Sequence, residues 1–102
     1  MLVMITSTYP LNKQPEVGEV WSKARESPSP LVKTHHTLVK ADLECGVKSY
    51  TILEVEEGKE DEGLWAIGQR MQGYWGIEGY TFSMDVVWEA EEALARQAAQ
   101  TA

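Results

Sequence analysis

The sequence contains a single cysteine, Cys45, among its 102 residues. One cysteine excludes a disulfide within the chain and is typical of proteins from a reducing compartment. The sequence also lacks any apolar run close to the roughly 18 residues that a membrane-spanning helix requires. The first residues, Met1–Ser7, have neither the basic flank nor the small-residue cleavage site of a signal peptide. We therefore expect a cytoplasmic protein that does not interact with membranes.

Basic residues are also scarce. Nine Lys and Arg stand against sixteen Asp and Glu, which gives a formal net charge of −7. A surface with this charge repels phosphate backbones, and we therefore expect no nucleic-acid partner. With 43% apolar and 25% charged residues the composition is that of a globular chain, and the length predicts a single domain, residues 1–102.

Four segments have the β-branched or alternating apolar pattern that is typical of strands. These predicted strands are Leu2–Ser7, Val32–Ala41, Val47–Val55 and Ile77–Met84. The second and third are separated by residues 42–46, which predict a hairpin in which Gly46 adopts a positive φ.

Two segments between these strands have the apolar spacing of amphipathic helices. The first follows Asn12, which we expect to be its N-cap, and its apolar stripe consists of Val17, Val20, Trp21 and Ala24. The second begins with the acidic residues 60–62, and its stripe consists of Leu64, Ile67, Gly68 and Met71. The tail, residues 89–102, is rich in Ala, Glu and Gln and predicts a third helix.

The resulting order of elements is β-α-β-β-α-β with a C-terminal helix. Right-handed crossovers in both βαβ halves place the first two helices on one face of a four-stranded antiparallel sheet. The sequence therefore predicts an α+β fold of the split β-α-β, or ferredoxin-like, type.

Several features resemble those of the dimeric α/β-barrel superfamily. They are the strand Leu2–Ser7 before a Tyr9-Pro10 turn, the strand sequence Thr34-His35-His36-Thr37, and the helix after the last strand. The resemblance covers nearly the whole chain and implies a homodimer with a ligand pocket between sheet and helices. Haem-degrading members use a histidine on the second helix; residues 64–75 contain none, so the resemblance does not extend to haem. We expect no cofactor.

A physical argument also favours a homodimer. The first strand is apolar on both faces, because Met1, Val3 and Ile5 alternate with Leu2 and Met4. Two helices cover only one face of the sheet, and the other would expose a larger apolar patch than soluble monomers usually do. Pairing with the sheet of a second copy would cover this patch. The alternative is that the terminal helix folds back over the bare face of its own chain.

His35 and His36 are the only histidines and the candidate catalytic residues. Side chains of adjacent strand residues point to opposite faces, so this pair is not expected to chelate one ion, and we predict no metal site. Each histidine is either a structural imidazole or, if it enters a pocket, a candidate general base.

Trp65 and Tyr80 are the other candidate pocket residues, together with His35 or His36, between the sheet and its helices. Other patterns predict no site. Gly58–Gly63 has the glycine spacing of a phosphate loop but is followed by Leu-Trp where that loop needs Lys-Ser or Lys-Thr. The acidic residues 54–62 lack the ligand order of a calcium loop.

Two functions remain open from the sequence. The first is a small homodimer that binds an apolar or aromatic small molecule, or simply assembles, without catalysis. The second is a cofactor-independent oxygenase-like or isomerase-like enzyme in which His35 or His36 is the general base. A histidine inside an enclosed cavity would favour the enzyme, and solvent-facing histidines would favour the binding protein.

Overall fold

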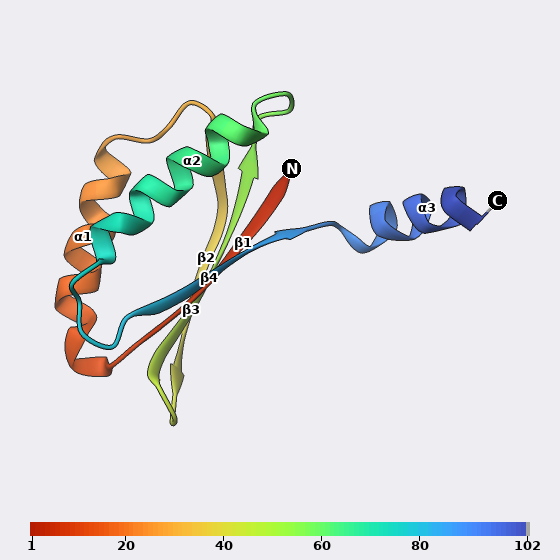
Figure 1. Ribbon diagram of the computed structural model, residues 1–102. Helices are drawn as coiled ribbons and strands as arrows, with labels where there is room; N and C mark the ends of the chain where they lie inside the picture. The colour runs from red at the N-terminus through yellow and green to blue at the C-terminus, as the bar shows by residue number, and fades with distance from the viewer. Residues whose placement is uncertain (102) are drawn as a thin grey trace.

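The computed structural model describes residues 1–101 (Figure 1). Its strands and α-helices are β1 (Leu2–Tyr9), α1 (Gln14–Glu26), β2 (Val32–Asp42), β3 (Gly46–Val55), α2 (Glu60–Met71), β4 (Thr81–Val87) and α3 (Ala90–Thr101). Two short 3-10 helices, η1 (Leu11–Lys13) and η2 (Gln72–Tyr74), precede α1 and follow α2. The prediction of an α+β chain with a four-stranded antiparallel sheet and three α-helices is confirmed.

The strands are ordered β2-β3-β1-β4, and every neighbouring pair is antiparallel. β1 is an inner strand that pairs with β3 on one side and with β4 on the other. Because β3 separates β1 from β2, and β1 separates β3 from β4, each of α1 and α2 connects two strands across a third. Figure 1 shows α1 and α2 on the same side of the sheet.

β1 presents alternate side chains to two different environments. Its helix-facing residues are buried; they are Val3, Ile5, Ser7 and Tyr9. Its other residues are half-buried and lie on the opposite face, which we call the open face. Through the strand register, the open face comprises Leu2, Met4, Thr6 and Thr8 of β1, Lys48, Tyr50, Ile52 and Glu54 of β3, His36, Leu38 and Lys40 of β2, and Thr81, Ser83, Asp85 and Val87 of β4.

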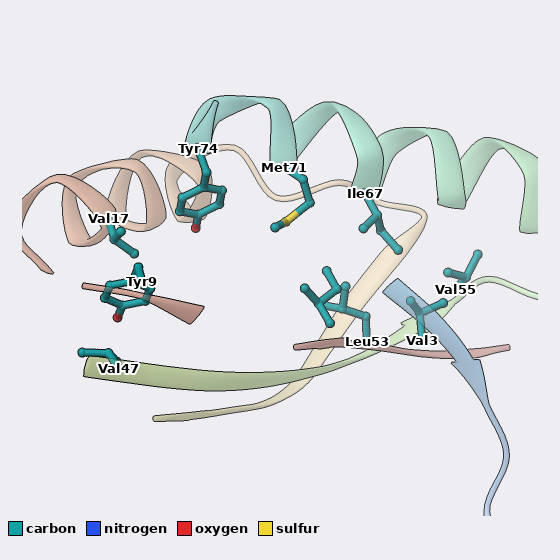
Figure 2. Close-up of a cluster of buried hydrophobic side chains, with 10 residues drawn as sticks. Val3, Tyr9, Val17, Val47, Leu53, Val55, Ile67, Met71 and Tyr74 are labelled. Atoms are coloured by element: carbon teal, nitrogen blue, oxygen red, sulfur yellow. The ribbon is translucent and has the colours of Figure 1, made fainter. Parts of the chain in front are cut away.

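The hydrophobic core lies between the helices and the helix-facing side of the sheet (Figure 2). The α2 helix contributes Ile67 and Met71, one turn apart, and approaches the sheet closely at Gly63. A Cβ on Gly63 would lie only 2.2 Å from Cγ1 of Val55, so a larger residue would push α2 away from β3. The α1 helix contributes only Val17 to the buried core. The two helices are therefore packed unequally against the sheet.

The predicted bounds of the last strand are wrong. β4 begins at Thr81 rather than Ile77 and continues to Val87 rather than Met84. Gly76 and Gly79, with φ of +92° and +82°, keep the chain in turns up to residue 80. Gly79 also passes so close to Pro10 that a Cβ would lie 2.6 Å from its ring. The strand therefore starts only beyond this contact, and its far end is fixed by pairing with β1.

The predicted cap of the first helix is also wrong. Asn12 lies within η1, and the N-cap position of α1 is Lys13, which makes no side-chain capping hydrogen bond. The backbone N–H of Lys13 donates to the carbonyl oxygen of Pro10 at 2.9 Å, which closes a 3-10 turn around Asn12. α1 therefore starts one residue later than predicted, with Pro15 in its first turn.

The third helix extends away from the sheet and from the other two helices (Figure 1). Residues 90–100 are all exposed. The alternative in which the terminal helix folds back over the sheet of its own chain is therefore not what the structure shows, and the open face has no helix over it. Within residues 1–101, no helix combines the length and the apolar character needed to cross a membrane.

Candidate ligand-binding cavity

A cavity of about 600 Å³ lies between α1, the end of α2, η2 and the helix-facing side of the sheet. It exists because α1 presents little bulk to the sheet beyond Val17. Gly18 lines the cavity and has nothing within 4 Å of where a Cβ would stand. Thr37 and Val39 of β2 also line the cavity and are exposed, so its open side lies along this edge strand.

Three stacked tyrosines form one wall of the cavity, and we call Tyr9, Tyr74 and Tyr80 the tyrosine stack. The rings of Tyr74 and Tyr80 are nearly parallel, with centroids 4.6 Å apart and an interplanar angle of 4°. The centroids of Tyr9 and Tyr80 are 5.9 Å apart at 16°. Such stacking fixes the rings relative to one another, and the three side chains line the cavity.

Hydrogen bonds hold two of these rings in place. The Tyr80 hydroxyl donates to Oγ of Ser7, 2.9 Å away on β1. The Tyr9 hydroxyl donates to Oε1 of Gln14 at 3.4 Å, which links the end of β1 to the first residue of α1. The stack is thus anchored to both the sheet and the helix layer.

Burial raises the pKa of all three phenols. The pKa of Tyr74 rises to about 12, mainly because burial penalises the phenolate and also because Tyr80 and Tyr9 lie close by. Burial is likewise the main cause of the raised pKa of Tyr9 and of Tyr80. The stack is therefore uncharged at neutral pH and is suited to aromatic contacts and hydrogen bonding rather than to proton abstraction.

Its helical spacing predicted Trp21 as a core residue, but Trp21 lies at the edge of the cavity. Its side chain is 40% exposed. The guanidinium carbon of Arg25 stands 4.6 Å from the centre of the Trp21 ring, and both residues line the cavity. Because α1 stands off the sheet here, Trp21 packs under Arg25 instead of reaching the strands.

Of the predicted pocket residues, the structure places only Tyr80 in this cavity. Trp65 is 70% exposed and lines a separate groove between α2 and β4, with Trp75, Phe82 and Met84. Trp65 lies next to Leu64 on the side of α2 that faces the edge strand β4. Its ring is therefore directed away from the tyrosine stack.

The prediction that His35 and His36 point to opposite faces of the sheet is wrong. The register between β2 and β3 shifts between Thr34 and His36, so that His36 pairs with Ile52 on the open face. Nε2 of His35 lies 2.7 Å from Oε1 of Glu54, which belongs to the same face. The irregularity adds a residue to β2, and this resets the alternation on which the prediction depended.

Both histidines are thus on the far side of the sheet from the cavity. The hydrogen bond with His35 lowers the pKa of Glu54, which is an exposed carboxylate. Within residues 1–101 the structure assembles no group of three His, Cys, Asp or Glu side chains that could hold a metal ion. The absence of a metal stays a prediction.

No protein-family model matches this chain, and no curated protein sequence matches it. The function is therefore inferred from the geometry of the cavity itself.

Proposed function

We propose that the protein is a small homodimer that binds an aromatic or otherwise apolar small molecule in the cavity beneath α1, without catalysis. The observation that carries this proposal is the cavity of about 600 Å³ with the tyrosine stack as its wall. Ligand sites typically have volumes of roughly 300–1,000 Å³, with mostly apolar and aromatic walls and a few polar groups.

The composition of the cavity wall supports an apolar ligand. Ile5, Leu53 and Met71 supply aliphatic surface, and the tyrosine stack supplies aromatic surface. A ring stacked on such a wall gains about 0.5–1.5 kcal/mol beyond the burial of its area. Hydroxyl groups of Ser49 and Thr51 supply a small number of polar contacts that would orient the ligand.

The position of the histidines supports binding over catalysis. A general base must lie within hydrogen-bonding reach of the proton that it removes. His35 and His36 lie on the open face and do not line the cavity. The enzyme hypothesis therefore has no histidine next to a ligand in this cavity.

The homodimer is proposed to form through the open face. The strand order, with two helices on one side, supports a ferredoxin-like arrangement, and face-to-face pairing of two such sheets would give a dimeric α/β barrel. The open face has apolar side chains at Met4, Leu38, Tyr50 and Ile52. A stable dimer buries about 800 Å² on each partner, and this face, which also has charged side chains such as Lys40 and Glu54 around its apolar ones, has no helix over it.

A matched pair of glycine substitutions tests the ligand site. Gly18 lines the cavity and Gly68 lines the groove beside Trp65, and a Cβ at either position meets nothing within 4 Å. Leucine at position 18 takes up cavity volume, whereas leucine at position 68 does not. The probe is N-phenyl-1-naphthylamine, an uncharged aromatic dye whose fluorescence rises in apolar sites.

We expect the wild-type chain to bind the dye with one site per chain. Gly18→Leu should weaken binding about tenfold or more, and Gly68→Leu should bind like wild type. Thermal unfolding of both variants checks that they are folded. Absence of dye binding to the wild type, or weakening by Gly68→Leu alone, would contradict the proposed site.

A further inference from the structure

The cavity differs from the rest of the protein in its charge. The chain has sixteen Asp and Glu against nine Lys and Arg. Among the described residues, the charged side chains that line the cavity are those of Arg25 and Arg70, and no Asp or Glu lines it. Two positive charges thus border an apolar space in a strongly acidic protein.

The two arginines lie near the same end of α1. Nη2 of Arg70, on α2, donates a hydrogen bond to the carbonyl oxygen of Ser27 at 2.9 Å. Ser27 is the residue directly after α1, and Arg25 lies in the last turn of that helix. The Arg70 side chain therefore reaches from α2 to the end of α1 that carries Arg25.

Both guanidinium groups keep N–H donors for a ligand. In the part of the chain that the structure describes, neither forms an ion pair with a carboxylate. Arg70 makes one hydrogen bond, to Ser27, out of the five donors that a guanidinium group has. Arg25 contacts the ring of Trp21 through a cation–π interaction, and within residues 1–101 its guanidinium N–H groups form no hydrogen bond.

The tyrosine stack lies toward the other end of α1. Tyr9 is hydrogen-bonded to Gln14, the first residue of this helix, and stacks on Tyr80. The cavity therefore has a tyrosine-lined end and a cationic end, where Trp21 lies beside Arg25. Aliphatic side chains of the sheet and of α2 lie among its lining residues. An elongated molecule with one apolar and one anionic end matches this arrangement.

We propose that the ligand is an apolar carboxylic acid, with its carboxylate at Arg25 and Arg70 and its apolar body directed toward the tyrosine stack. This ligand class rests on the proposed binding function of the same cavity. Guanidinium groups hold carboxylates through paired, charge-assisted hydrogen bonds, which are shorter and stronger than those between neutral groups.

Both arginines also have structural roles, which the test must separate from ligand recognition. Arg25 lies in the last turn of α1, where a cation interacts favourably with the helix dipole, and Arg70 links α2 to Ser27. Lys23 lies in the same last turn and pairs with Glu19, but it does not line the cavity. Lys23→Gln is therefore the matched control for loss of one positive charge.

The experiment compares 6-phenylhexanoate with its uncharged amide, 6-phenylhexanamide, by calorimetric titration of the full chain. The ratio of the two affinities cancels any loss of stability that affects both ligands alike. The proteins are the wild type, Arg25→Gln, Arg70→Gln and Lys23→Gln. Since Arg70→Gln also removes the link to Ser27, Arg25→Gln provides an independent variant.

We expect the wild type to bind the carboxylate at least tenfold more tightly than the amide. Arg25→Gln and Arg70→Gln should each reduce this ratio severalfold, and Lys23→Gln should leave it unchanged. Equal binding of both ligands to the wild type, or an unchanged ratio in both arginine variants, would overturn the carboxylate proposal and leave the binding function intact. If neither ligand binds, the proposed function fails together with this inference.

Discussion

Leu38 and Val39 are neighbours in β2 and are almost equally exposed, at 59% and 57%, but they belong to opposite faces of the sheet. Leu38 pairs with Tyr50 on the open face, whereas Val39 pairs with Ser49 and lines the cavity. Substitutions at these two positions can therefore distinguish the proposed dimer interface on the open face from the cavity on the other face.

Leu38→Glu should weaken the proposed homodimer, because it would replace an apolar side chain at the proposed interface with a buried carboxylate. Val39→Glu introduces the same charge at the same exposure on the other face and should leave the dimer intact. Sedimentation at micromolar concentration measures the mass of each variant. A wild-type protein with the mass of one chain would contradict the dimer, as would dissociation by Val39→Glu but not by Leu38→Glu.

Gly63 and Gly68 provide a second matched pair, within α2. Gly63→Ala should destabilise the protein by about 1–3 kcal/mol, since its Cβ would overlap Val55 and force α2 away from β3. Gly68→Ala meets no such obstacle and should stabilise the helix by up to about 1 kcal/mol. Urea unfolding measures both free energies, and the same sign for both changes would refute this account of the α2 packing.

The tyrosine stack predicts a loss of stability at high pH. Raised phenol pKa values in the folded state mean that folding favours the protonated forms. Their contribution is therefore fully present below the unfolded pKa of 10.0 and is lost as the pH rises toward about 12, the pKa of Tyr74.

Tyr74→Phe keeps the ring and removes the phenol, so it should reduce the alkaline loss with little change at neutral pH. Tyrosinate absorbance, titrated in folded and denatured protein, measures the shift directly. Coincident titration of the folded and denatured chains would show that the stack does not bury its phenols.

The hairpin between β2 and β3 depends on Asp42. One of its carboxylate oxygens accepts backbone hydrogen bonds from Glu44 at 2.9 Å and Cys45 at 3.3 Å. These bonds lower the pKa of Asp42, so their contribution is present above the unfolded pKa and is lost as the pH falls through the lower, folded value. Asp42→Asn keeps an acceptor and should retain more of the melting temperature than Asp42→Ala; the reverse order would contradict this role.

The four strands and the two covering helices are predictable because each has either a β-branched composition or a regular apolar spacing. The helix-facing residues of β1 alternate regularly, and Ile67 and Met71 fall on one face of α2. The positions of His35 and His36 are not predictable in the same way, because the bulge appears only in the register of β2 against β3. Similarly, the start of β4 depends on the contact between Gly79 and Pro10, which are distant in sequence.

A pocket between the sheet and its helices was expected, but of its predicted lining only Tyr80 was right, because the other lining residues follow from how α1 packs on the sheet rather than from a motif. Trp21 has the spacing of a core residue, and only the structure shows that it lines an open space. Gly18, directly after the first residue of the apolar stripe of α1, is the one sequence signal for missing bulk at this position. Arg25 and Arg70 are far apart in the chain, and only the tertiary structure brings Arg70 to the end of α1 that carries Arg25.

The most direct test of the ligand site is an NMR titration of the labelled chain with 6-phenylhexanoate, observed at the indole N–H groups. The chain has four tryptophans, and Trp21 lines the cavity, whereas Trp65 and Trp75 line the groove between α2 and β4. Binding in the cavity should shift the Trp21 signal and leave those of Trp65 and Trp75 in place. Shifts of Trp65 and Trp75 without a shift of Trp21, or no shift at all, would contradict the account.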